Sequence, residues 1–153
     1  MEDWVDDRNE REDLARRAKD RFWEIFPGMA DRAWDGIKKR ITGDAAKLNE
    51  TSKSLRGQIT INKRPIIPSA STLYVDNETF PTVLLEITVL PHAKCIKILQ
   101  SGRTAPDANF KDSKETLNMD LDGNDQVVIT DPNGQDLRVP DGVSKYILER
   151  FLR

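Results

Sequence analysis

The sequence contains few of the residues on which metal and nucleophile sites depend. Its 153 residues include a single cysteine, Cys95, and a single histidine, His92. One cysteine cannot form an internal disulfide, and zinc sites usually take several Cys or His ligands. Phosphate-loop, dinucleotide-binding, nucleophile-elbow and HExxH motifs are absent as well. We therefore expect no disulfide, metal or cofactor, and we favour a non-catalytic protein over an enzyme.

Charge of one sign and long apolar runs are also lacking. The chain has 24 basic and 26 acidic residues, a net charge of −2, spread almost evenly along it. Affinity for nucleic acids and anionic membranes comes mostly from excess positive charge, so neither partner is expected. No apolar run approaches the roughly 18 residues of a membrane span, and the N-terminus is acidic, unlike a secretory signal. We expect a soluble, cytoplasmic protein.

Residues 1–56 are predicted to form a helical arm of one or two helices. Between Arg8 and Phe26 apolar residues recur at four-residue steps, which indicates a helix that Pro27 and Gly28 should break or kink. A second helix is predicted from near Asp31, with an apolar stripe spaced by three or four residues, as in seams between helices. The stripe comprises Trp34, Ile37, Ile41, Ala45, Leu48, Ser52 and Leu55. We expect it to pack on its own domain; pairing with a helix of another chain is the alternative.

Residues 57–153 show the two-residue alternation of half-buried strands. The predicted strands are 58–62, 72–76, 83–90, 95–100, 116–121, 126–130 and 136–139. A C-terminal helix with Asp141 as its N-cap follows. The fold class is therefore α+β, with an antiparallel sheet of six to seven strands, the helical arm, and the C-terminal helix packed on the sheet. One globular domain accommodates all of it.

The central hairpin has a definite predicted register. Cross-strand partners share a face of the sheet, so a pairing that places Lys97 opposite Ile87 is excluded. Pairing Ile87 with Ile98 and Val89 with Ile96 keeps both faces consistent, and residues 91–94 form the loop. His92 then lies at an exposed loop tip, away from the support that a metal ligand or catalytic base needs.

Four other segments resemble functional motifs only weakly, and a structural interpretation is favoured or remains open for each. Residues 120–125 are a hairpin turn rather than a calcium loop, because the glycine is misplaced. The basic run 38–40 has acidic neighbours and indicates a solvated helix face. Residues 64–68 fit a PxxP pattern that is short enough to arise by chance. The segment 101–115 is predicted to be a long loop, either functional or disordered.

The strongest functional signal is the second face of the central hairpin, which is more apolar than an exposed face should be. We predict an interaction surface there and on the helix stripe, used for a protein partner or a homodimer. Its residues are Leu84, Leu90, Cys95, Lys97 and Leu99 on the strands, and Trp34, Ile37, Ile41 and Leu48 on the helix. The alternative is a small-ligand or enzymatic domain with a pocket between sheet and helix near the 101–115 loop. Nucleic-acid binding is a weaker alternative.

Overall fold

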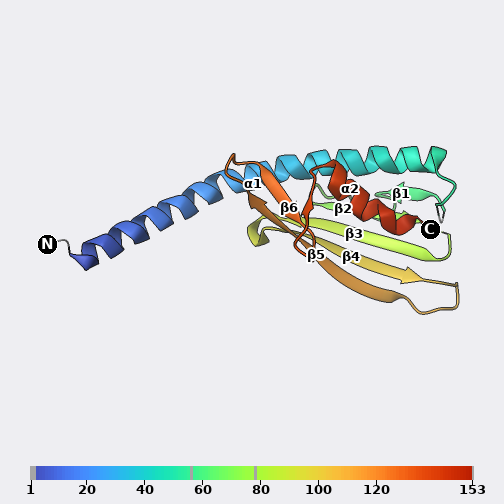
Figure 1. Ribbon diagram of the computed structural model, residues 1–153. Coiled ribbons are helices and arrows are strands. Elements are labelled where there is room, and N and C mark those ends of the chain that lie inside the picture. Colours follow the sequence, from blue (N-terminus) through green and yellow to red (C-terminus); the bar gives the residue numbers. More distant parts are fainter. Residues whose placement is uncertain (1–2, 56, 78, 153) are drawn as a thin grey trace.

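The computed structural model describes residues 3–55, 57–77 and 79–152, and it has the predicted α+β class. The ends of the predicted ranges at residues 1, 56 and 153 lie outside the described residues. A long helix, α1 (Trp4–Thr51), precedes a seven-stranded sheet, and a short helix, α2 (Asp141–Leu148), follows it. Figure 1 shows the second half of α1 lying along the sheet and the first half extending away from it.

Helix α1 is continuous, so of the two predicted effects of Pro27, a break or a kink, the break is excluded, and the predicted helix start at Asp31 is wrong. The helix begins at Asp3, whose carboxylate accepts a hydrogen bond from the Val5 amide at 3.0 Å. Proline removes one backbone donor, but Phe26 and Ala30 on either side of it are fully buried against the body. Packing of these two residues against the rest of the chain therefore keeps the helix continuous at Pro27. The axis changes direction between the free part and the part over the sheet (Figure 1), as expected of a proline kink.

The sheet is an antiparallel meander in which each strand pairs with the next along the chain. The strands are β1 (Ile59–Ile61), β2 (Thr72–Asn77), β3 (Thr82–Leu90), β4 (Cys95–Arg103), β5 (Lys111–Leu121), β6 (Val127–Thr130) and β7 (Asp136–Leu137). The predicted hairpin register is confirmed, with Ile87 paired to Ile98 and Val89 to Ile96.

The long loop predicted at 101–115 is mostly strand. β4 continues to Arg103 and β5 begins at Lys111, so only residues 104–110 connect them. The extension carries polar residues such as Ser101 and Asp112, which pair in register; Ser101 is half-buried and Asp112 is exposed. Because this end of the sheet projects past the core, it lacks the apolar alternation that identifies a strand.

The core lies between one face of the sheet and the helices. From β2 to β6, inward residues such as Leu73, Leu85, Ile98, Leu117 and Ile129 are at most 1% exposed. The helices bury against them a set comprising Phe26, Ala30, Trp34, Ile37, Ile41, Ala45, Val143, Ile147, Leu148 and Phe151. These apolar residues, removed from water together, are the main source of stability.

The ends of the fold are fixed by side-chain contacts to the sheet. Asn49 of α1 exchanges two 2.9 Å hydrogen bonds with the backbone of Ile59, which covers the β1 edge. Tyr146 of α2 donates to Glu115 of β5. The prediction that Asp141 is the N-cap of α2 is wrong, because Pro140 occupies that position and makes no side-chain hydrogen bond. Asp141 lies in the first turn, where its negative charge interacts favourably with the helix dipole.

Candidate functional site: the outer face of the central hairpin

The candidate site lies on the side of β3 and β4 that faces away from the helices. Strand alternation brings together on this outer face all five predicted strand residues, Leu84, Leu90, Cys95, Lys97 and Leu99. Most of them are half-buried, and Leu90 is 37% exposed. The structure therefore places these five residues on one surface, defined here as the outer face.

A cleft of about 390 Å³ occupies one half of the outer face. Leu84 and Leu99 form its apolar part. Register places Glu86 across from Leu99, and Leu99 across from Lys114 of β5, so an acid and a base flank that leucine. The cleft thus combines a small apolar floor with charges of both signs. Leu90 and Cys95 pair with each other at the opposite end of the hairpin, outside this cleft.

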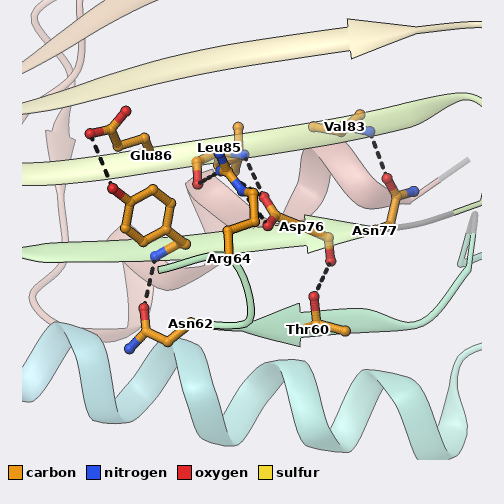
Figure 2. A network of polar contacts seen from close by, with 9 residues as sticks. Thr60, Asn62, Arg64, Asp76, Asn77, Val83, Leu85 and Glu86 are labelled. Carbon is orange, nitrogen blue, oxygen red and sulfur yellow. Dashed lines mark hydrogen bonds and ion pairs between the residues drawn. The ribbon is translucent and has the colours of Figure 1, made fainter. Parts of the chain in front are cut away.

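Arg64, from the loop between β1 and β2, closes one side of the cleft. Its Nε and Nη2 lie 2.6 and 2.9 Å from the two carboxylate oxygens of Asp76, and Nη2 also donates to the Leu85 carbonyl at 3.0 Å. The guanidinium carbon lies 4.7 Å from the centre of the Tyr74 ring. Figure 2 shows this group, in which a loop residue reaches over two strands. Bidentate pairing of this kind fixes orientation as well as charge.

Neighbouring bonds hold the strands beneath Arg64. The Asp76 side chain is 5% exposed and accepts a 3.1 Å hydrogen bond from the Leu85 amide. Asn77 likewise accepts from the Val83 amide at 2.6 Å, and the Tyr74 hydroxyl lies 3.5 Å from Glu86 (Figure 2). Every one of these bonds joins β2 to β3. The rim of the cleft is therefore built on a rigid pair of strands.

Sequence reasoning missed Arg64, Asp76 and Glu86. The only available signal was Asp76 at the end of an otherwise well-patterned strand, where a charge next to apolar residues implies a partner. Its partner Arg64 is twelve residues away in an irregular proline-containing loop. No periodicity connects such positions, so only the folded loop reveals the pair.

The predicted helix stripe lies on the other side of the sheet. Trp34, Ile37 and Ile41 are at most 2% exposed and belong to the chain's own core. Leu48 is half-buried and lines a groove of about 300 Å³ between α1 and the C-terminal residues, beside Leu148. The structure therefore does not join the stripe to the outer face, and most of the stripe offers no surface to a partner.

His92 and Cys95 belong to different elements, the turn after β3 and the start of β4. His92 is exposed in the turn after β3, and Lys94 in the left-handed conformation ends that turn. Among the described residues no group of three or more Cys, His, Asp or Glu side chains could hold a metal ion. In the 120–125 segment, the Asp122 carboxylate accepts hydrogen bonds from the amides of Asn124 and Gln126, as turn residues do.

A second cleft, of about 400 Å³, lies at the far end of β4 and β5. Here Arg103 lies 5.4 Å from the Phe80 ring centre and 4.5 Å from that of Phe110, and its buried Nε has no hydrogen-bond partner within the described part of the chain. Lys111 contributes another positive charge to the lining. The predicted pocket near the 101–115 loop was expected between sheet and helix, whereas this cleft is lined by strand and loop residues.

The β1–β2 loop exposes an unusual pair of apolar residues. Ile66 is 99% exposed and Ile67 is 82% exposed, within the proline-flanked segment that follows Arg64. The loop is nonetheless anchored, because both Trp34 Nε1 and Lys38 Nζ donate to the Ala70 carbonyl at 2.9 Å. Single exposed apolar residues are common, but two adjacent ones are not explained by the chain's own packing.

Comparison with known proteins finds no protein family, no curated protein and no solved structure that this chain matches. Within the part of the chain that the structure describes, neither helix is long and apolar enough to cross a membrane.

Proposed function

We propose that this chain is a non-catalytic interaction protein that binds a protein partner through the outer face. The observation that carries the proposal is the Leu84–Leu99 cleft, an apolar floor flanked by Arg64, Glu86 and Lys114 that no element of the chain covers in the described structure. A cytoplasmic location, expected from the sequence, belongs to the same proposal.

The composition of this surface favours a protein over a small molecule. Protein interfaces combine an apolar centre with a polar rim, and their charged pairs set specificity and register more than affinity. The outer face has both features across three adjacent strands. Ile66 and Ile67 extend from the same loop that supplies Arg64, and a partner that reaches them would gain two apolar anchors.

The test compares two variants of the immobilised chain. We expect Leu84→Lys/Leu99→Lys to lose the protein that the wild-type chain captures specifically, because each lysine buries a charge in the contact. Ala46→Lys, exposed on α1 on the opposite side of the sheet, is the matched control and should retain that protein. If both variants capture the same proteins as the wild type, the outer face is not the binding surface.

A second candidate function is the binding of a small organic anion at the cleft beside Arg103. The specific observation in its favour is the buried Arg103 Nε, which no acceptor among the described residues reaches, between two aromatic rings. A panel of small aromatic carboxylates and phosphates should shift the amide resonances of residues 100–111 in the wild-type chain but not in Arg103→Gln. Absence of shifts at millimolar ligand would exclude this function.

A further inference from the structure

The first 18 residues of α1, Trp4–Arg21, form a helix that contacts little of the rest of the chain. Every residue in this segment, which we call the arm, is exposed. At 1.5 Å per residue the arm is about 27 Å long. Its base is fixed by Arg21, whose guanidinium makes two bonds of 2.7 and 3.2 Å to the Asp125 carboxylate in the β5–β6 turn. The arm therefore projects from the body in a defined direction (Figure 1).

Isolated helices of this length are marginal in water, so an exposed arm gains stability from any surface that pairs with it. The two ends of the arm have opposite charge. Residues 3–13 contain six acidic and two basic side chains, whereas residues 14–21 contain four basic and one acidic. Acids near the N-terminus and bases farther along interact favourably with the helix dipole. The same distribution makes the arm electrostatically complementary to a second arm that runs in the opposite direction.

One side of the arm carries the residues suited to close contact. Trp4, Arg11, Ala15, Ala18 and Phe22 lie along one stripe, because steps of three, four or seven residues return to nearly the same side of a helix. Alanines in the middle allow two helix axes to approach closely. Trp4 at the tip is 70% exposed, and Phe22 at the base is only half-buried in a cluster with Trp23 and Phe26.

We propose that the arm pairs antiparallel with the arm of a second copy of this chain. Placing Trp4 against the partner's Phe22 brings the acidic half of each arm alongside the basic half of the other, with Glu10 on the same flank as the partner's Arg17. Two-fold symmetry then repeats each contact. Both indoles reach the half-buried aromatic residues at the opposite base. Arg16 already lies 2.7 Å from Asp13 of its own arm, and such an exposed pair can exchange partners at little cost.

The charge distribution of the arm favours antiparallel over parallel pairing, and it favours a second copy of this chain as the partner. A parallel pair would place six acids beside six acids at one end and four bases beside four bases at the other. The arm is a different surface from the outer face and does not depend on the proposed function. Joined at their arms, two chains would present two outer faces and bind a bivalent target more tightly than one chain.

The expected dimer is weak and sensitive to salt. Two helices of this length bury less than the roughly 1,200 Å² typical of stable complexes. Sedimentation equilibrium of the full chain at low ionic strength should show a dimer that grows as concentration rises from about 10 to about 300 µM. Its dimer fraction should fall at least severalfold at about 0.5 M salt, where the Debye length approaches 4 Å. A monomer across this concentration range at low salt would overturn the proposal.

Charge-reversed chains test the direction of pairing. Asp7→Lys/Glu10→Lys removes the net negative charge of residues 3–13, and Arg16→Glu/Lys19→Glu removes the net positive charge of residues 14–21. We expect each variant alone to be monomeric and an equimolar mixture to form heterodimers. A mixture as monomeric as its components would refute antiparallel pairing.

The outer-face variant Leu84→Lys/Leu99→Lys separates the two proposals, since it should dimerise like the wild type. If it alone abolishes dimers, the outer face forms the contact and the arm does not. Circular dichroism of all chains checks that the body remains folded.

Discussion

Removal of the Arg64 side chain should destabilise the fold although Arg64 is a loop residue on the surface. Arg64→Ala eliminates the bidentate pair with Asp76, the bond to the Leu85 carbonyl and the stacking on Tyr74. Asp76 stays behind as a carboxylate that is 5% exposed. Its remaining described side-chain partner is the Leu85 amide, which cannot balance a full charge.

The size of the effect follows from the exposure of the two groups. Breaking a buried ion pair by removing one partner costs about 3–5 kcal/mol. The Arg64 side chain is 39% exposed, so water can enter and hydrate Asp76 once the guanidinium is gone. We therefore expect a loss of about 2–3 kcal/mol, from a total unfolding free energy of about 5–15 kcal/mol. Arg8→Ala, which breaks an exposed arm pair with Glu12, should cost at most about 0.5 kcal/mol.

Urea unfolding monitored by circular dichroism measures both variants. Asp76→Asn and the double variant Arg64→Ala/Asp76→Asn complete a mutant cycle, in which the double variant should be more stable than the sum of the single losses predicts. We expect a coupling of at least about 1 kcal/mol because the double variant contains no unpaired charge. An Arg64→Ala loss below about 0.5 kcal/mol, or additive single losses, would refute it.

Two further predictions concern the stability of the fold. Burial and the bond to Glu115 raise the pKa of Tyr146 to about 12. The variant Tyr74→Phe leaves Tyr146 as the single tyrosine of the sequence, so its phenolate absorbance should appear well above pH 10, the usual pKa of tyrosine being about 10. The folded chain keeps this proton where the unfolded chain loses it, so unfolding free energy should fall as pH rises from about 10 to about 12, and a titration near 10 would contradict this. A Cβ on Gly102 would lie 2.8 Å from the Thr82 carbonyl oxygen, whereas one on Gly36 meets nothing within 4 Å. In urea unfolding, Gly102→Ala should cost about 1–3 kcal/mol and Gly36→Ala should gain up to about 1 kcal/mol, and a reversed order would refute the assigned contacts.

Local pattern was sufficient for the sheet and its faces. Alternation in β3 and β4 identified the inward residues, and the matching of faces fixed the pairing of Ile87 with Ile98, because a one-residue slip would reverse every side chain. Alternation and register also place Leu84 and Leu99 on the outward side of the sheet. These conclusions depend on neighbours along one strand or across one hairpin, which a sequence records directly.

Local pattern failed where distant contacts decide the outcome. Pro27 signals a helix end, but burial of Phe26 and Ala30 against the sheet holds α1 together. The strands extend to Arg103 and Lys111 by pairing with each other rather than by burying apolar residues.

The sequence by itself determined the α+β class, the antiparallel sheet and the outward side of the central hairpin, because each follows from periodicity and turn chemistry. Tertiary structure alone decided which surfaces are free. It buried Trp34, Ile37 and Ile41 and left the arm exposed. It also brought Arg64 across two strands to Asp76. Availability to a partner depends on what the rest of the chain covers, and that is a property of the folded molecule.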